Sequence, residues 1–166
     1  LPDGYSGAAM TPDNSNVVAG GTYFGDNFDL NYNLFVSNGT RGANGQDINK
    51  DKGLGGRVRF TFQDKYKIGA SYYTVQNQES VGRENLVGLD LEAALLDNFL
   101  LQAEYVRDLY DNGADRLSYY ARLTYRMGRL SPFVMYDHFK DSGDLVWKNG
   151  QNRYGVGVSY DVSNNI

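Results

Sequence analysis

The sequence contains no cysteine, one histidine and three prolines in 166 residues. Without thiols the chain can form neither a disulfide framework nor a thiolate metal site. With a single histidine, catalysis that needs a nucleophile beside an imidazole base has one place to occur. The scarcity of proline, together with the composition described below, favours β structure.

The chain also lacks any apolar run near the roughly 20 residues that a transmembrane helix needs. Charged residues make up 22% of the chain, its mean hydropathy is −0.53, and its formal net charge is −4. A helical membrane protein is therefore excluded. A transmembrane β-barrel is not, because its strands alternate lipid-facing and lumen-facing residues and average out to polar. The acidic balance argues against nucleic acid as a partner.

Glycine and aromatic residues are abundant: the chain has 20 Gly, 14 Tyr and 8 Phe. Aromatic side chains favour pleated, half-buried strands, and glycine supplies turns and tight spots between them. The composition therefore favours an all-β fold.

Alternation of apolar and polar residues recurs along the chain. In the segment 28–37, Phe28, Leu30, Tyr32, Leu34 and Val36 fall on one face, and mostly polar residues fall on the other. A helix would scatter both sets around its circumference, so the segment is predicted to be a strand. The same pattern, weakest in the first segment, predicts nine strands, at 16–24, 28–37, 57–63, 67–73, 87–95, 99–105, 117–127, 130–137 and 153–162.

The connections between these segments alternate between two kinds. Tight turns are predicted near residues 25–26, 64–65, 97–98, 128–129 and 164–165, and longer polar loops at 38–53, 77–84, 110–115 and 140–151. Short turns on one rim and long loops on the other are typical of outer-membrane barrels. We therefore predict a single domain over 1–166, an all-β, antiparallel, up-and-down transmembrane β-barrel in the bacterial outer membrane.

Tyrosines gather toward the ends of the apolar faces. An aromatic ring with a polar tip suits the headgroup level of a membrane, so these residues predict interfacial girdles in contact with membrane lipids. The simpler alternative is that tyrosine is a good strand former. The residues concerned are Tyr105, Tyr119, Tyr125, Tyr136, Tyr154 and Tyr160.

Two stretches resemble a known family. The run 33–39 (NLFVSNG), its polar loop and the run 55–60 (GGRVRF) resemble Gram-negative porins, and most closely the group of the phosphate-selective porins O and P. The segments 68–73 and 130–137 look like porin strands as well. The resemblance implies a channel of about 16 to 18 strands, usually a homotrimer, of which this chain supplies about half. The odd strand number indicates either a piece of a larger barrel, the interpretation that we favour, or a loop in place of the first predicted strand. The phosphate-binding residues of that group have no match here, so phosphate selectivity is not implied.

Charged residues on the inward face form the candidate site. In a wide barrel they line a wet channel and filter solutes by charge, whereas in a narrow barrel they pair as a polar core. The predicted pore-lining residues are Arg57, Arg59, Lys67, Asp90, Glu92, Glu104, Arg122, Arg126, Asp137 and Arg153. Asp29 and Asp161 share their face. Basic residues dominate some strands and acidic ones others, which would suit opposed walls of a constriction, with chance as the alternative.

Other polar features give weaker evidence for a functional site. Arg107 lies past the apolar band, where it would be solvated or would meet lipopolysaccharide phosphates. The segment 47–51 has the oxygen spacing of a calcium loop, but Lys52 and Val58 stand where such a loop needs Gly and Glu. His138 is placed on the outward face, away from Asp137, which argues against an enzyme. We expect no metal and no cofactor.

Three functions remain open. The first is a porin that passes small hydrophilic solutes or ions by passive diffusion. The second is a small closed barrel of eight strands that acts structurally or adhesively through its loops. The third, a soluble all-β binding protein, would have to expose a far larger apolar patch than soluble monomers tolerate.

Overall fold

The computed structural model describes residues 17–37, 52–77, 82–111, 113, 115–143 and 148–162, and all regular structure among them is β. Within these residues no helix is long and apolar enough to cross a bilayer. The strands are β1 (Val17–Phe24), β2 (Phe28–Ser37), β3 (Gly53–Phe62), β4 (Tyr66–Asn77), β5 (Gly82–Leu95), β6 (Phe99–Tyr110), β7 (Asp115–Tyr125), β8 (Leu130–Asp141) and β9 (Gln151–Tyr160).

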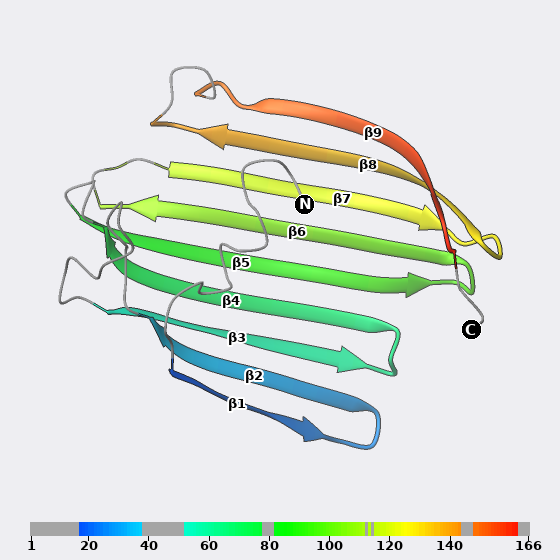
Figure 1. The fold of residues 1–166 in the computed structure, drawn as a ribbon, viewed down its shortest axis with the longest axis horizontal. Helices are drawn as coiled ribbons and strands as arrows, with labels where there is room; N and C mark the ends of the chain where they lie inside the picture. Colours follow the sequence, from blue (N-terminus) through cyan, green and yellow to red (C-terminus); the bar gives the residue numbers. More distant parts are fainter. Residues whose placement is uncertain are drawn as a thin grey trace.

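The nine strands form one sheet in which each strand pairs with its neighbours in sequence. All eight pairings are antiparallel, in the order β1 to β9 (Figure 1). β1 and β9 each have a partner on one side only among the described residues. The predicted all-β, up-and-down architecture is therefore confirmed, as an open curved sheet that is consistent with part of a barrel.

The register keeps the two sets of side chains on separate faces across the whole sheet. Because pairing preserves the pleat, residues joined in register share one face. One such row consists mostly of apolar and aromatic residues. We call the face on which it lies the outward face. It runs through Tyr32, Val58, Ala70, Leu89, Tyr105, Tyr119, His138 and Asn152.

The outward face is an apolar band between two levels of aromatic rings. Ile68 on β4 is 57% exposed, Val134 on β8 54% and Val156 on β9 85%. On β4, β6, β7 and β9 two aromatic residues stand six positions apart, about 20 Å along a strand. These pairs are Tyr66 and Tyr72, Phe99 and Tyr105, Tyr119 and Tyr125, and Tyr154 and Tyr160. A band of this kind between aromatic levels fits a bilayer and does not fit a soluble surface.

Strand ends differ from the sequence prediction. At the loop rim β4, β5, β6 and β8 continue several residues beyond the apolar alternation, because antiparallel pairing goes on between polar residues there. At the turn rim β7 ends at Tyr125, two residues early, and Met127 bridges to Leu130 instead. Gly128 makes that tight turn with φ of 57°.

The hairpin turns lie where the sequence predicts them. At the β3–β4 turn Gln63 and Asp64 have φ of 50° and 55°. Left-handed values at both central residues are what a two-residue hairpin turn needs to match the right-handed twist of its strands. At the β5–β6 turn Leu96 has φ of 57°. The loop 38–51, with the segment 47–51, lies outside the described residues, as do residues 164–165.

A charged residue on the outward face tests the assignment of the two faces. We expect Val134→Arg to lower the free energy of unfolding from lipid vesicles by about 2 to 4 kcal/mol, because the guanidinium would lie in hydrocarbon. Met135→Arg, one residue along the same strand, places the same group on the other face and should cost much less. Equal losses for the two variants would contradict the assignment.

Candidate functional site

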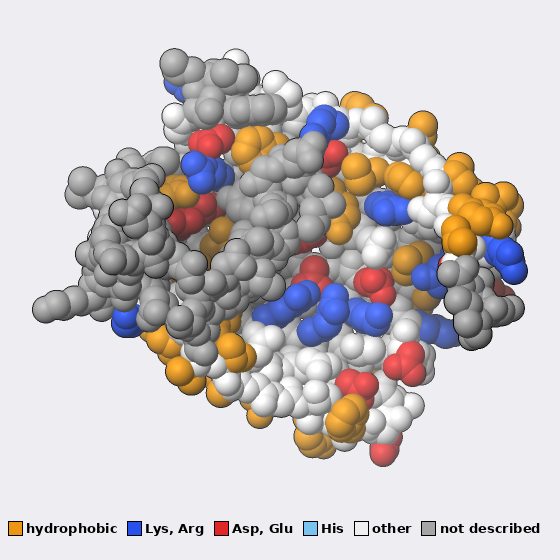
Figure 2. Space-filling model, viewed as in Figure 1, with side chains coloured by type: hydrophobic (Ala, Val, Ile, Leu, Met, Phe, Trp, Pro, Cys, Tyr) orange, Lys and Arg blue, Asp and Glu red, His pale blue; other side chains and the backbone are white. Residues whose placement is uncertain are grey.

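The polar face of the sheet collects the predicted pore-lining residues. Figure 2 shows Lys, Arg, Asp and Glu side chains gathered over the middle of this face. One register row carries five of those residues, Arg59, Asp90, Glu104, Asp137 and Arg153, on β3, β5, β6, β8 and β9. The next row toward the turns carries Lys67, Glu92 and Arg122, and the next toward the loops carries Arg57.

Arg126 is the exception. The sequence places it on a strand that runs to residue 127, but the structure places it after the end of β7. It is exposed there, and its backbone N–H donates to the carbonyl oxygen of Asn98 at 2.8 Å. Turn formation by Gly128 ends the strand before the side-chain alternation does. Arg126 therefore lies at the turn rim, away from the central rows.

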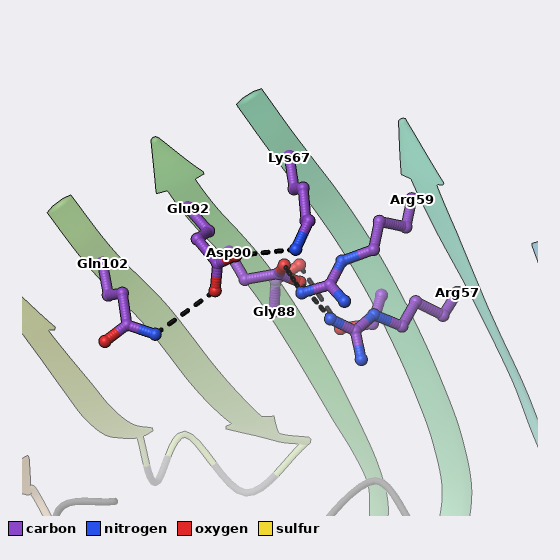
Figure 3. Close-up of polar contacts among 8 residues, drawn as sticks. Arg57, Arg59, Lys67, Gly88, Asp90, Glu92 and Gln102 are labelled. Carbon is purple, nitrogen blue, oxygen red and sulfur yellow. Dashed lines mark hydrogen bonds and ion pairs between the residues drawn. The ribbon is translucent and has the colours of Figure 1, made fainter. Parts of the chain in front are cut away.

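Asp90 is the centre of the strongest contacts on this face. Its Oδ1 accepts a hydrogen bond from Arg57 Nη2 at 2.6 Å, and its Oδ2 accepts one from Arg59 Nη2 at 3.1 Å. Figure 3 shows both guanidinium groups reaching from β3 to the carboxylate on β5. A carboxylate that pairs with two guanidinium groups is held in one place by charge-assisted bonds.

These contacts pass over an intervening strand. Gly69 on β4 pairs with Arg59 on one side and with Asp90 on the other. A Cβ built at Gly69 would meet both carboxylate oxygens of Asp90, and would come within 2.7 Å of its Cγ. The missing side chain therefore leaves a gap, here called the Gly69 gap, in which the Asp90 carboxylate lies.

A second cluster lies one row toward the turns. Lys67 Nζ donates to Glu92 Oε1 at 2.7 Å, and Gln102 Nε2 donates to Glu92 Oε2 at 3.3 Å. The three residues come from β4, β5 and β6, as Figure 3 shows. Both oxygens of the carboxylate are thus occupied, so Glu92 is fixed between its neighbours.

Arg122 on β7 and Arg153 on β9 also contact neighbouring side chains of the polar face. Arg153 Nε donates to Asp137 Oδ1 at 2.7 Å, and the Asp137 side chain is only 4% exposed. The Arg122 guanidinium lies 3.8 Å from the centre of the Phe133 ring, a cation–π contact. Phe133 in turn covers Gly157 on β9, where a Cβ would come within 2.6 Å of its ring.

Near the loop rim the same face carries another polar group. Tyr110 donates its hydroxyl to Asp108 at 2.8 Å and accepts a bond from Arg116 Nη1 at 3.0 Å. Arg116 also donates from Nε to Asp141 at 2.8 Å. None of these residues was singled out from the sequence, because their strands extend past the apolar alternation that marks a strand.

The expected opposed walls of a constriction are wrong for these strands. The basic residues of β3 and β4 and the acidic residues of β5 are neighbours on one wall, and they bond directly to one another. Basic and acidic residues are therefore intermixed along a single curved surface.

The other polar residues singled out from the sequence contact neighbours on the outward face. His138 lies on the outward face, stacked on Tyr119 with ring centres 4.9 Å apart, while Asp137 points to the other face. Arg107, also outward, is paired by two hydrogen bonds to Asp115 at 3.2 and 2.8 Å. No group of three or more His, Asp or Glu side chains in the described part of the chain could hold a metal ion.

A family model described as Gram-negative porin matches residues 3–166 of this chain. The match supports the porin resemblance seen in the sequence and does not single out the phosphate-selective group. No curated protein matches the chain.

The stack of Phe35 on Tyr73 also depends on a glycine. The two rings lie with centres 5.7 Å apart, from β2 and β4, over Gly55 on β3. A Cβ at Gly55 would come within 2.8 Å of the Phe35 ring. We expect Gly55→Ala to lower the free energy of unfolding by about 1 to 3 kcal/mol through overpacking.

The control for Gly55→Ala is Gly155→Ala, on the same face of β9, where the new Cβ would meet Met135 at an ordinary 3.8 Å. Urea titration of both variants in lipid vesicles measures the difference. A loss as large for Gly155→Ala as for Gly55→Ala would remove the ring contact as its cause.

Proposed function

Since the chain belongs to the Gram-negative porin family of the bacterial outer membrane, we propose that it forms the wall of a water-filled channel for small hydrophilic or charged solutes. The observation that carries the proposal is the two-faced sheet. One face presents an apolar band between aromatic levels, and the other presents rows of charged residues. Where one face of the sheet contacts lipid, the charged residues on the other face need water around them, because charges in contact with hydrocarbon are costly.

Strand direction argues against closure of these nine strands on themselves. β1 and β9 are both odd-numbered in an antiparallel order, so they run the same way and would pair in parallel if the sheet closed on itself. An antiparallel barrel therefore needs an odd number of further strands between them. Seven or nine more strands, added to these nine, give barrels of 16 or 18. Residues 1–166 then supply about half of the barrel.

A small closed barrel is not favoured by the same observation. Eight strands close into a barrel only if the first and last pair with each other, and its interior is filled by side chains. Here the described edge strands do not pair, and β1 side chains such as Val17 are 74% exposed. Among the described residues, no pairing between the first and last strands therefore supports the small closed barrel with a structural or adhesive role.

Charged side chains on the polar face lie along the wall instead of standing across the space in front of it. Arg57, Arg59 and Lys67 bond to carboxylates of β5, and Arg122 stacks on Phe133. Side chains held this way leave the middle of a wide barrel to water and solute. The porin family favours such a channel over an enzyme.

The partners that follow from this proposal are solutes, lipids and other copies of the chain. The aromatic levels and the apolar band would contact membrane lipids and lipopolysaccharide. A homotrimer is the assembly that the porin resemblance implies, and cross-linking followed by mass measurement in detergent would test it. The channel needs no cofactor for passive diffusion.

Conduction tests the proposed function. We expect the intact protein, reconstituted in planar bilayers, to give stepwise single-channel currents that scale with salt concentration, because ions cross through water. Protein that inserts into the bilayer, as shown by its folded migration on gels, and never conducts would contradict the channel.

The absence of cysteine allows a direct test of which residues line the pore. In Glu104→Cys the new thiol lies on the polar face of β6, and in Ala103→Cys it lies on the outward face one residue away. We expect a charged, water-soluble thiol reagent to change the current through the first variant and not through the second. A response limited to Ala103→Cys would reverse the assignment of the faces.

A further inference from the structure

In the ion pairs that join β3 and β4 to β5, the basic side chain is more exposed than the acidic one. Exposed side-chain fractions are 40% for Arg57 and 38% for Arg59, against 20% for Asp90, which both contact. Lys67 is 35% exposed and Glu92 30%, a smaller difference. Of these five residues three are basic and two acidic. A solute passing in front of them meets the basic groups first.

The Gly69 gap explains how Asp90 comes to lie behind its partners. On a strand with side chains at every position, the group facing Asp90 on β4 would occupy the space between β3 and β5. Gly69 leaves that space empty, and the Asp90 carboxylate enters it, toward the backbone of β4. The two arginines of β3 bond to the same carboxylate from the other side, and Figure 3 shows both reaching toward Asp90.

Both arginines are partly exposed, at 40% and 38%, although the Nε atom of each is buried, so only their Nη groups are left for a solute. Each uses one Nη2 atom on Asp90 in the bonds above. A guanidinium has five N–H donors in a planar fork, a geometry suited to carboxylate and phosphate oxygens. Arg57 and Arg59 therefore fit passing anions while their own counter-charge lies below them.

We propose that Gly69 is a positioning residue for charge selectivity: the gap that it leaves seats the Asp90 carboxylate behind Arg57 and Arg59, so that this wall favours anionic solutes. The inference rests on the proposed channel function. Gly69 carries no charge and touches no solute; it acts through the place that it gives to Asp90.

The test uses a substitution that changes no charge. In Gly69→Ala the new Cβ occupies the place of the Asp90 carboxylate, and the atoms it meets belong to a side chain that can turn away. We expect the carboxylate to move toward the lumen and to offset the arginines there. The intact protein in planar bilayers under a KCl gradient should have a reversal potential on the chloride side. Gly69→Ala should shift that potential toward the potassium side.

Two further variants separate this effect from a loss of structure. Asp90→Ala should increase the chloride preference, and adding Gly69→Ala to it should produce no further shift, because the clashing carboxylate is gone. Gly155→Ala adds the same methyl group on the same face, in ordinary contact with Met135, and should leave the reversal potential unchanged. A merely structural role for Gly69 would not give a shift that depends on Asp90.

The outcomes divide cleanly between the two proposals. Wild-type protein that inserts and does not conduct overturns the channel. A conducting wild type without chloride preference overturns the inference and leaves the channel in place. So does a reversal potential that is the same in Gly69→Ala as in wild type, or a Gly69→Ala shift that persists in the Asp90→Ala background. Should Gly69→Ala fail to fold, an unchanged selectivity in Asp90→Ala would overturn the inference by itself.

Discussion

The antiparallel hydrogen-bond ladder is the constraint on which the rest of this structure depends. In hydrocarbon no water is available to backbone N–H and C=O groups, so a spanning sheet must pair every one of them with a neighbouring strand. That pairing runs without interruption from β1 to β9. Because side chains alternate along each strand, the same ladder separates the apolar outward face from the polar face across all nine strands. A slip of one residue in any pairing would exchange the two faces.

The faces could be predicted from the sequence because alternation is a local property. The alternate residues Val87, Leu89 and Leu91 of β5 indicate which side of their strand is apolar without knowledge of any partner strand, and the structure places them on the outward face. Tight turns were also accessible, since glycine, asparagine and aspartate gather there, although the left-handed positions themselves include Gln63 and Leu96, which no turn signal marks. Strand ends were not accessible at the loop rim, where polar pairs such as Gln76 with Arg83 continue the ladder without an apolar signal.

Contacts between charges lay beyond the sequence because they depend on register over several strands. Asp90 and Arg57 are 33 residues apart and are separated by β4, so the strand between them decides whether they meet. The sequence marked both residues as inward and left open whether acidic and basic strands stood on opposed walls or were separated by chance. It gave no importance to Gly69, since a glycine in a strand usually indicates a weak or bulged position. Only the register shows that this glycine stands between an arginine and an aspartate.

Three glycines on the polar face share one physical role. Phe35 covers Gly55, Asp90 enters the gap at Gly69, and Phe133 covers Gly157. In each case a large or charged side chain lies down over a neighbouring strand. Such packing buries part of the side chain against backbone, and it shortens the distance by which that side chain would extend from the wall. A channel gains width in this way without any change in the number of strands.

Partnered charges also suit a passive channel better than isolated ones. A solute must be attracted strongly enough to enter and weakly enough to leave. An isolated arginine cluster would hold an anion, because nothing else would offset its charge. Here Asp90 already satisfies one donor of Arg57 and one of Arg59, and Glu92 binds Lys67. In the proposed channel, the remaining attraction for an anion is reduced by the carboxylates behind the bases, so this face can favour one sign of charge and still release each solute. The depth at which those carboxylates lie would then govern both selectivity and release.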